Sequence, residues 1–271
     1  MQCAAVISRS CPGLATTLAV QKAYVDKYHN FPAFTAFTAY DGVMAFAEAI
    51  KRAGSTDPDK IVAAQNGIRF VHDLHTGQKT GGFLDQRENH RAAAKYASGQ
   101  VLDCFTYHGG FALTIAAKAD RVEATDLSGA AITIARENQQ LNNIANVTFS
   151  EANSFDALKA HDSSGRKFDM VILDPPAFAK NRESVPAAVR GYKEINLRAL
   201  KILKPGGTLV TCSCSYHIPE ALFLNVIAEA ANDARRATQV IERRAQARDH
   251  PILLTMPETH YLKCFILKVL E

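Results

Sequence analysis

The feature of this sequence that most constrains its fold is a regular alternation of short apolar runs and helix-like segments after Gly99. Strands are expected at residues 101–105, 121–126, 147–149, 168–173, 208–212, 238–242 and 262–269. Helices are expected at residues 110–118, 129–142, 187–203 and 219–233. Strands that alternate with helices form crossover connections, which place neighbouring strands parallel. We therefore predict an α/β domain over residues 99–271, with a Rossmann-like, doubly wound, mainly parallel sheet of seven strands.

The chain before Gly99 does not continue this alternation and divides into two further segments. Residues 1–65 are predicted to form a helical appendage, whose last short helix ends near Asn66. Residues 66–98 are predicted to form a β-hairpin followed by a helix. The expected strands of the hairpin are residues 68–74 and 83–85, and the expected helix is residues 86–97.

The composition is that of a water-soluble globular protein, with 47% hydrophobic and 21% charged residues. A membrane span needs about 18 consecutive apolar residues, and no stretch of the chain approaches this, so we expect no membrane insertion. The net charge of +4 permits contact with a polyanion. The N-terminus has no positively charged segment before its short apolar run, so it does not resemble a secretory signal.

The six cysteines are scattered, without CxxC spacing or a cluster of cysteine and histidine. This distribution argues against a zinc site and against a disulfide scaffold, so we expect no metal. A set of mostly reduced thiols is typical of the cytoplasm, where a free cysteine can act as a nucleophile. We therefore predict a cytoplasmic protein.

Ligands of a doubly wound sheet bind beyond the carboxyl ends of its central strands. Asp103 lies near the end of the first expected strand, and Phe105 and Thr106 lead into a turn that contains Gly109 and Gly110. Glycines at such a turn let the backbone approach a ligand closely. These residues are candidates for binding a nucleotide-like cofactor. The sequence does not match the GxGxxG pattern, and a strand-to-helix turn without a ligand is the alternative.

Further candidates for the cofactor site follow the second and third strands. Asp126 closes the second strand about 20 residues after the glycine turn, where an acid accepts hydrogen bonds from ribose hydroxyls, and Leu127 follows it. The alternative for Asp126 is the start of a helix cap beside Ser128. Asn153 and Ser154 follow the third strand, where the amide could recognise an adenine edge. An ordinary Asn-Ser turn is the alternative.

Two candidates for chemistry follow the fourth and fifth strands. Asp174 precedes two prolines, which cannot continue a strand and so hold a rigid loop over the crevice; the alternative is a simple strand terminator. Cys214 lies just beyond the strand at 208–212 and is predicted to face the crevice. Cys212 points the same way but lies roughly 6.5 Å deeper, so it is predicted to be a core thiol. A free cysteine is also commonly a buried small hydrophobe, which is the alternative for Cys214.

Basic side chains follow the Asp-Pro-Pro loop and could contact phosphates, which would make binding sensitive to salt. They are Lys180, Arg182, Arg190 and Lys193. A solvated helix face is the alternative.

Several segments of the chain carry a family resemblance. They are residues 73–81 (DLHTGQKTG), 83–87 (FLDQR), 174–176 (DPP), 190–193 (RGYK), 213–215 (SCS), 249–251 (DHP) and 261–263 (YLK). On these segments the chain resembles the bacterial large-subunit ribosomal RNA 5-methylcytosine methyltransferases, over about three quarters of its length and in the expected order. The resemblance implies a class I methyltransferase fold, S-adenosylmethionine as cofactor, and ribosomal RNA as partner.

The resemblance also implies a covalent mechanism. The thiolate at the Ser-Cys-Ser position, here Cys214, adds to C6 of cytosine, so that C5 becomes nucleophilic enough to accept the methyl group. Asp174 would hydrogen-bond the amino or ring nitrogen edge of that base. The resemblance at residues 190–193 adds Tyr192 as a candidate for contacting the substrate, beside Lys180, Arg190 and Lys193. Related RNA enzymes carry a second cysteine in the Asp-Pro-Pro loop, which this chain lacks, and the base that removes the C5 proton is not assigned.

The N-terminal part departs from that family. Its members carry a small RNA-binding domain and most of a substrate-recognition domain before the hairpin, and we expect both to be missing, with residues 66–98 as a remnant. Residues 16–64 instead resemble the C-terminal part of periplasmic branched-chain amino acid binding proteins. About 50 residues cannot rebuild a two-lobed cleft, so no ligand is transferred from that resemblance. We expect cofactor binding to survive better than RNA affinity.

Two other functions remain compatible with the sequence. The Asp-Pro-Pro loop also suits methylation of an exocyclic amine, with Asp174 polarising the amino group and no thiol required. A cofactor-binding remnant without RNA activity is the second alternative.

Overall fold

The computed structural model describes residues 60–73 and 81–270 of the 271-residue chain. The chain separates into two compact units, residues 1–62 and 63–271. The helical appendage expected over residues 1–65 lies almost entirely outside the described residues. The fold reported below is therefore that of the second unit.

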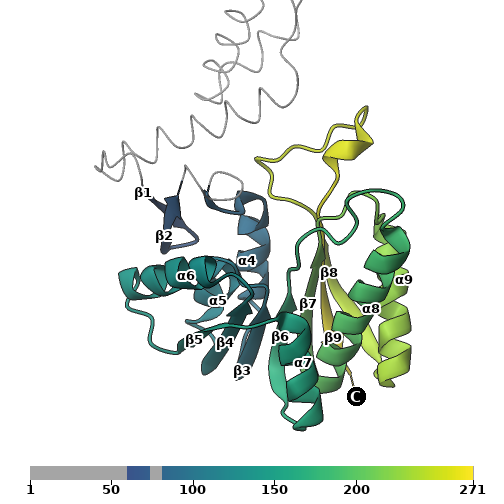
Figure 1. The fold of residues 1–271 in the computed structure, drawn as a ribbon, viewed down its shortest axis with the longest axis horizontal. Coiled ribbons are helices and arrows are strands. Elements are labelled where there is room, and N and C mark those ends of the chain that lie inside the picture. The colour runs from purple at the N-terminus through teal and green to yellow at the C-terminus, as the bar shows by residue number, and fades with distance from the viewer. Residues whose placement is uncertain (1–59, 74–80, 271) are drawn as a thin grey trace, which may run out of the picture. The chain divides into compact units, whose positions relative to one another are not determined.

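The second unit is built on a seven-stranded sheet with the strand order β5-β4-β3-β6-β7-β9-β8 (Figure 1). In chain order its strands are β3 (Gln100–Cys104), β4 (Arg121–Asp126), β5 (Val147–Glu151), β6 (Phe168–Leu173), β7 (Leu203–Ser213), β8 (Thr238–Arg244) and β9 (Lys263–Val269). The strands from β5 to β7 in this order are parallel, whereas β9 is antiparallel to both β7 and β8. This arrangement confirms the predicted doubly wound, mainly parallel sheet.

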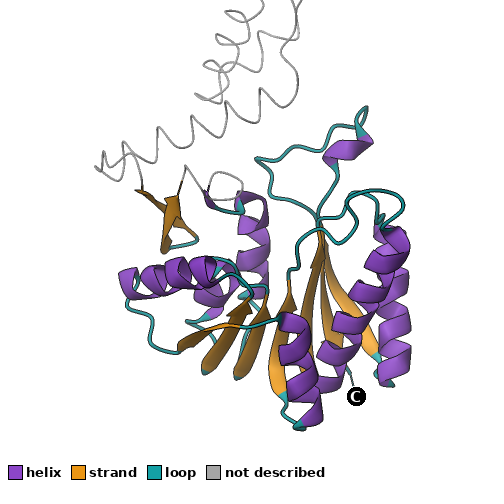
Figure 2. Ribbon diagram, viewed as in Figure 1, coloured by secondary structure: helices purple, strands orange, loops and turns teal. Residues whose placement is uncertain are grey.

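Helices cover both faces of this sheet (Figure 2). They are α4 (Arg87–Ala93), α5 (Gly110–Ile115), α6 (Gly129–Leu141), α7 (Ser154–Ser163), α8 (Val185–Ile202) and α9 (Glu220–Ala234), with short 3-10 turns at Leu84–Gln86 and Pro257–Thr259. Apolar side chains of α4, α5 and α6 form one core with the sheet, and those of α7, α8 and α9 form the other.

Strand β6 shows why the central strands are apolar throughout. Met170 and Ile172 belong to the core on the α5 side, whereas Val171 and Leu173 belong to the core on the α8 side. Successive side chains of a strand point to opposite faces, so a strand covered on both faces must be apolar at every position. The continuous apolar run in the sequence is the direct consequence.

The N-terminal hairpin differs from the prediction. Strand β2 (Ile68–Asp73) pairs with β1 (Lys60–Gln65), not with residues 83–85, and the short helix expected before Asn66 is a strand. Asn66 and Gly67 both have positive φ, at 53° and 84°. An Asn-Gly pair favours the two-residue turn that needs this conformation and joins antiparallel strands. The turn chemistry therefore decides the local fold, and residues 84–86 form a 3-10 turn leading into α4.

Helix α7 was not predicted. Asn153 is its N-cap, and the Asn153 side chain accepts a hydrogen bond from the backbone of Phe155. The helix buries only Ser154 and Leu158, so its apolar periodicity is too weak to stand out in the sequence. The cap on α6 was predicted, and there the Ser128 hydroxyl accepts from the Ala131 amide.

Candidate active site

A pocket of about 400 Å³ lies where the strand order reverses between β3 and β6, at the carboxyl ends of the parallel strands. This is the position at which doubly wound sheets bind ligands. The predicted site residues that line it are Phe105, Thr106, Gly110, Asp126, Leu127, Asn153, Ser154, Asp174 and Cys214. Residues from five strand ends therefore meet in one cavity, although they are spread over more than 100 positions of the chain.

The loop after β3 has a strained backbone. Phe105, Tyr107 and Gly109 all adopt left-handed conformations, with φ values of 64°, 50° and 84°. Residues other than glycine rarely hold this conformation unless the surroundings enforce it. Here the amide of Phe105 donates to Ser154 Oγ at 3.2 Å, and the amide of Tyr107 donates to Asp126 Oδ2 at 2.9 Å. The neighbouring strand ends thus hold the loop in a single shape at the pocket wall.

Asp103 stabilises this loop from the protein interior. It is fully buried and does not line the pocket, so its side chain is not placed to contact a ligand as predicted. Its Oδ2 accepts from Thr106 Oγ1 at 2.6 Å and from the Ala112 amide at 3.0 Å. Burial raises the pKa of Asp103 to about 7, against the opposing effect of the Thr106 hydrogen bond. Gly109 also lies outside the pocket wall and acts through the turn.

Asp126 and the adjacent Leu127 give the pocket a polar and an apolar surface next to each other. The two oxygens of Asp126 accept from the backbone amides of Tyr107 and Ser128, each at 2.9 Å. A carboxylate oxygen accepts more than one hydrogen bond, so both oxygens retain capacity for hydroxyl donors. Leu127 is 70% exposed, which is unusual for a leucine beside a pocket. A ligand with a hydroxylated part and a flat apolar part would use both side chains.

Aromatic rings form the floor beside them. Phe105, Phe155 and Phe178 all line the pocket, with ring centroids 5.9–6.5 Å apart. The Asn153 side chain next to them accepts from the Phe155 amide at 2.9 Å, so its oxygen serves as the cap of α7. This part of the pocket suits an aromatic ligand ring.

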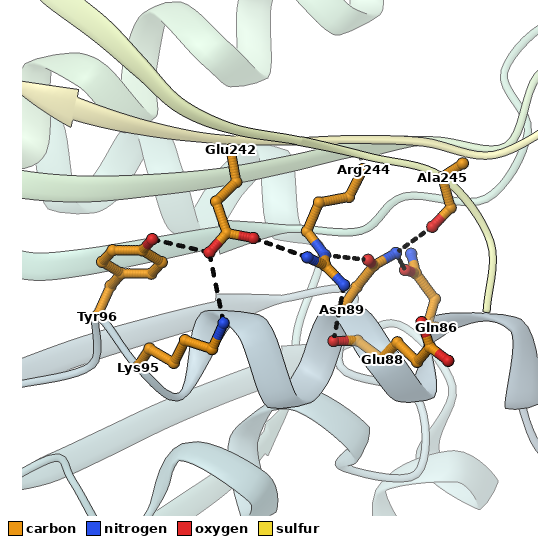
Figure 3. Close-up of polar contacts among 8 residues, drawn as sticks. All are labelled: Gln86, Glu88, Asn89, Lys95, Tyr96, Glu242, Arg244 and Ala245. Atoms are coloured by element: carbon orange, nitrogen blue, oxygen red, sulfur yellow. Dashed lines mark hydrogen bonds and ion pairs between the residues drawn. The ribbon is translucent and has the colours of Figure 1, made fainter. Parts of the chain in front are cut away.

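A chain of hydrogen bonds fixes Asp174 on the other side of the pocket. Gln86 Nε2 donates to Asp174 Oδ1 at 2.8 Å. Asn89 Nδ2 donates to Gln86 Oε1 at 2.7 Å, and Arg244 Nε donates to Asn89 Oδ1 at 2.8 Å (Figure 3). Glu242 in turn accepts from Arg244 Nη1 at 2.7 Å. Because each amide is held at both ends, the donor group of Gln86 is directed at the Asp174 carboxylate.

Cys214 differs from the other described cysteines. It is half-buried, lines the pocket, and has its Sγ 3.9 Å from the Pro175 carbonyl oxygen. Cys104, Cys212 and Cys264 are buried, and burial raises the pKa of the Cys104 and Cys212 thiols. Cys212 faces Cys264 across β7 and β9. Within residues 60–73 and 81–270, Cys214 is therefore the thiol that a ligand in the pocket can reach.

Tyr192 stabilises the segment around Cys214. Its hydroxyl lies 3.0 Å from Ser213 Oγ and 3.0 Å from Ser215 Oγ, and Ser215 Oγ accepts from the Ala179 amide. Tyr192 was predicted to contact substrate, but its side chain is fully buried in the core between α8 and the sheet. Burial raises the pKa of Tyr192 to about 12, so it remains a neutral phenol. It positions the two serines on either side of Cys214.

Three further polar residues near Cys214 were not among the predicted site residues. Asp85 lines the pocket, and its Oδ2 accepts from the Tyr261 hydroxyl at 2.7 Å. Lys263 is buried and donates to the carbonyl oxygens of Ser215 and Tyr261, at 2.7 and 2.9 Å. All three lie in segments that carry the family resemblance, 83–87 and 261–263, and that was the signal available for finding them.

The predicted basic residues divide into two groups. Lys180 and Arg190 are exposed beyond the Asp-Pro-Pro loop. Lys193 instead forms ion pairs with Glu229 and Asp233 of α9, at 3.1 and 3.0 Å. Its charge is therefore already matched.

The described part of the chain lacks two features. It contains no group of three His, Cys, Asp or Glu side chains arranged to hold a metal ion. It also contains no helix that is long and apolar enough to cross a membrane.

A doubly wound sheet with a pocket at its switch point and an acid closing the second strand defines the Rossmann-like class of nucleotide-cofactor enzymes. Comparison with known families narrows this class, because the family of S-adenosylmethionine-dependent methyltransferases matches residues 50–255. The chain belongs to this family, and its cofactor is S-adenosylmethionine.

The curated relatives carry one shared name. Proteins named ribosomal RNA large subunit methyltransferase I from Shewanella amazonensis and Aeromonas salmonicida are 45% and 42% identical to this chain over 213 and 219 residues. The alignments cover 77% and 79% of this chain but 54% and 55% of those proteins. The chain thus spans about half the length of the curated relatives it matches.

Solved structures share the fold. SMU.776, a methyltransferase crystallised with SAH, is 24% identical with a TM-score of 0.70, over 79% of this chain and 57% of that one. A SAM-dependent methyltransferase from Streptococcus mutans is 22% identical with a TM-score of 0.70 and the same coverage.

The pocket residues fit the family's cofactor. Asp126 has acceptor capacity for two ribose hydroxyls, and the exposed Leu127 would be covered by an adenine ring. The aromatic floor beside Asn153 continues this apolar surface. When bound, S-adenosylmethionine supplies an electrophilic methyl group.

Proposed function

We propose that this protein methylates C5 of a cytosine in large-subunit ribosomal RNA, with Cys214 as a covalent nucleophile. The observation that carries the proposal is that the Cys214 thiol lines the same pocket as Asp126 and Asp174. An accessible thiol has no role in methylating an amine, whereas addition to a pyrimidine ring requires one. The shared name of the curated relatives supports ribosomal RNA as the substrate.

Cys214 is proposed to act by addition to the cytosine ring and later elimination from it. Its thiolate forms a bond to C6 of the cytosine, which makes C5 nucleophilic. C5 takes the methyl group from the sulfur of S-adenosylmethionine, with S-adenosylhomocysteine as the leaving group, and C5 then loses its proton to a base. The bond between Cys214 Sγ and C6 then breaks, which restores the C5–C6 double bond and the thiolate. The target base must leave its stack to reach the pocket, as for other enzymes that modify nucleobases.

Asp174 is proposed to hold the target base. Its carboxylate would accept a hydrogen bond from the amino edge of the cytosine and so orient the ring for addition. The hydrogen bond from Gln86 supports this role, because it fixes one carboxylate oxygen and so sets the direction of the other. Lys180 and Arg190 are proposed to contact RNA phosphates from their exposed positions, whereas the buried Tyr192 and the ion-paired Lys193 are left out of that surface.

The domain organisation belongs to the same proposal. We assign residues 99–271 to the methyltransferase domain, residues 66–98 to a remnant of a substrate-recognition domain, and residues 1–65 to an appendage of unrelated origin. The compact unit that begins at Ala63 supports a boundary near this appendage. Phe83, Asp85 and Gln86 line the catalytic pocket, which supports keeping the 66–98 segment with the enzyme.

One experiment tests the function directly. The protein is incubated with labelled S-adenosylmethionine and ribosomal RNA, and the modified nucleoside is identified after digestion. The expected product is 5-methylcytidine. Label on N6 of adenosine or N4 of cytidine would overturn the proposal in favour of amine methylation. Bound cofactor with no transfer to any RNA would leave a cofactor-binding protein only.

A further inference from the structure

We propose that a second cavity, next to the catalytic pocket, binds a nucleotide that flanks the target base in the RNA strand. The phosphate of this nucleotide lies against Arg182 and Lys263, and its base stacks on Tyr216. The proposal rests on the proposed function, because it takes RNA as the substrate. It adds a second substrate subsite to the pocket that serves the cofactor and the target base.

The second cavity has a volume of about 380 Å³ and lies beyond the carboxyl end of β7. Its walls come from the chain before α8, the loop from β7 to α9, and the segment from the 3-10 turn at Pro257–Thr259 to the start of β9. Ligand pockets commonly measure about 300–1,000 Å³, so the cavity has room for part of a nucleotide. Its polar and aromatic lining consists of Arg182, Tyr216, His217, Glu220, His260 and Lys263.

A short segment of chain borders both the second cavity and the catalytic pocket. Cys214 lines the catalytic pocket, Tyr216 lines the second cavity, and Ser215 between them is buried. Two residues of extended chain span at most about 7 Å. An extruded base stays covalently joined to its neighbours in the strand. A nucleotide next to a target base at Cys214 therefore lies within reach of the second cavity.

Lys263 places a buried positive charge in the wall of the second cavity. Its residue is only 3% exposed. Its ammonium group donates to the carbonyl oxygens of Ser215 and Tyr261, at 2.7 and 2.9 Å, and has a third donor. Among residues 60–73 and 81–270, no carboxylate oxygen lies within 4.0 Å of its nitrogen. A buried lysine is normally paired with an anion, so a donor and a charge remain for a ligand.

Arg182 adds an exposed positive charge to the same cavity. Within the described part of the chain, its guanidinium group also has no carboxylate oxygen within 4.0 Å. The acid of the lining, Glu220, has Arg243 as a partner at 3.8 Å. His217 and His260 contribute ring nitrogens, which can donate to a phosphate oxygen. The cations of the lining therefore outnumber its acid, which favours an anionic ligand such as a phosphate.

Tyr216 distinguishes a nucleotide from a simple anion. Its side chain is 47% exposed, although it is a large aromatic residue. Its ring meets that of His217 edge-on, with centroids 5.2 Å apart and an angle of 68° between the planes. Exposed aromatic rings beside basic side chains are the surfaces on which proteins stack unpaired bases. The second cavity thus offers a contact for each part of a nucleotide.

RNA binding by variants of Arg182 and Tyr216 tests the proposal, and both side chains are exposed, so their replacement should leave the fold intact. The probe is a fluorescent single-stranded oligoribonucleotide with one central cytosine, and its Kd is measured by anisotropy from about 50 to about 200 mM salt. Arg182→Gln should weaken binding and reduce the slope of log K against log salt by about 0.7, the value for one phosphate of a single strand. Tyr216→Ala should weaken binding about five-fold or more with an unchanged slope.

Lys118→Gln is the matched control. Lys118 is also exposed, but it follows α5 and precedes β4, at the opposite edge of the parallel strands. Its replacement should leave the affinity for this probe at the wild-type value. Wild-type affinity and slope in both Arg182→Gln and Tyr216→Ala would overturn the proposal.

Replacing one phosphate of the probe at a time by an uncharged methylphosphonate locates the contact. At one linkage close to the cytosine, this replacement should weaken binding to the wild type but not to Arg182→Gln, which has already lost the contact. Equal effects on both proteins at every linkage would overturn the proposal. A changed Kd for S-adenosylmethionine in Arg182→Gln would also overturn it, because the cavity would then serve the cofactor. Binding of inorganic phosphate that depends on Arg182, with RNA binding that does not, would leave a site for a free anion only.

The outcome is separable from that of the proposed function. RNA binding that depends on Arg182 and Tyr216, with the methyl label on an amine nitrogen, would retain the second cavity as a subsite and reject the cytosine reaction. Formation of 5-methylcytidine with RNA affinity independent of both residues would retain the reaction and reject the subsite. No binding of the RNA probe at about 50 mM salt would reject both.

Discussion

The two sides of the catalytic pocket are assembled in different ways. The nucleotide half consists of Phe105, Thr106, Asp126, Leu127 and Asn153. The thiol half consists of Gln86, Asp174, Cys214, Tyr261 and Lys263. In the nucleotide half the hydrogen bonds join residues two positions apart, such as Ser128 with Asp126 and Phe155 with Asn153, and also residues 19 and 49 positions apart. In the thiol half they join residues 48, 88 and 176 positions apart.

This difference predicts that cofactor binding and chemistry can be separated by mutation. The nucleotide half lies at the ends of β3, β4 and β5 and is held by hydrogen bonds among these strand ends. The thiol half exists only when β6, β7, β9 and the segment before α4 are all in place. The following experiments break one half while measuring the other.

The largest expected effect is on the thiol half. Cys214→Ala should lower the rate of methyl transfer by at least about 10³-fold, because the nucleophile is lost. Cofactor affinity, measured by calorimetry, should stay at the wild-type value. Cys212→Ala, which removes a buried thiol of β7 two residues before Cys214, is the matched control and should retain activity. Undiminished transfer by Cys214→Ala would refute covalent catalysis.

The opposite pattern is expected for the nucleotide half. Asp126→Ala should raise the Kd for S-adenosylmethionine by about 10- to 100-fold, the range for losing hydrogen bonds to a charged acceptor. The rate at saturating cofactor should be nearly restored, since the thiol half is untouched. A loss of kcat without a change in Kd would show instead that the two halves are coupled.

The free energy of unfolding should depend on pH through His90, which lines the pocket. Burial lowers the pKa of His90 to about 3, against an opposing effect of Asp85, so the folded protein keeps His90 neutral. The unfolded chain takes up a proton near pH 6.5, so the free energy of unfolding should fall as the pH drops from 6.5 towards 3. Between pH 7 and pH 5 this group should cost about 2 kcal/mol.

The His90→Asn variant isolates that contribution in thermal melts. The variant should lose less stability than the wild type over the same pH range, although its stability at pH 7 should be lower because His90 packs against Phe111 with ring centroids 4.4 Å apart. Asp103 acts in the opposite direction, since its raised pKa of about 7 gives stability that is lost as the pH rises from 3.8 to 7. Equal acid sensitivity in both proteins would contradict the assignment to His90.

The smallest effect is expected when the hydrogen bond from Gln86 to Asp174 is removed. Gln86→Leu removes the donor that fixes its carboxylate, and methyl transfer should fall about ten-fold, with unchanged cofactor affinity. Gln239→Leu, at an exposed position of β8, is the control and should behave as wild type. A wild-type rate for Gln86→Leu would show that the hydrogen-bond chain from Arg244 is not needed for the reaction.

The same contrast explains what the sequence could predict. The central strands follow from their apolar runs, and Asp126, Asp174 and Cys214 were identified because parallel strands end at one edge of the sheet. The contacts of Gln86 and Lys263 were not predicted, because their partners lie far away in the chain and no local pattern brings them together.

Errors arose where side-chain direction decides the role. Asp103 and Tyr192 occupy positions beside the pocket in sequence, yet both side chains turn into the protein and hold its loops. The periodicity of a segment predicts the position of its backbone. It does not say whether a polar side chain finds its hydrogen-bond partners in the protein interior or in the pocket. The Asn-Gly turn at residues 66 and 67 was a local signal, and it was given too little weight against the helix expected before it.

The position of β9 has a consequence for how the enzyme becomes competent. This strand comes last in chain order but inserts between β7 and β8, and its first residue is Lys263. In a chain emerging from the ribosome, the strands and turns that hold Asp126 and Asn153 are made before β9, whereas the thiol half is incomplete until β9 has been synthesised. Methyl transfer would then become possible only after the last strand of the sheet has formed.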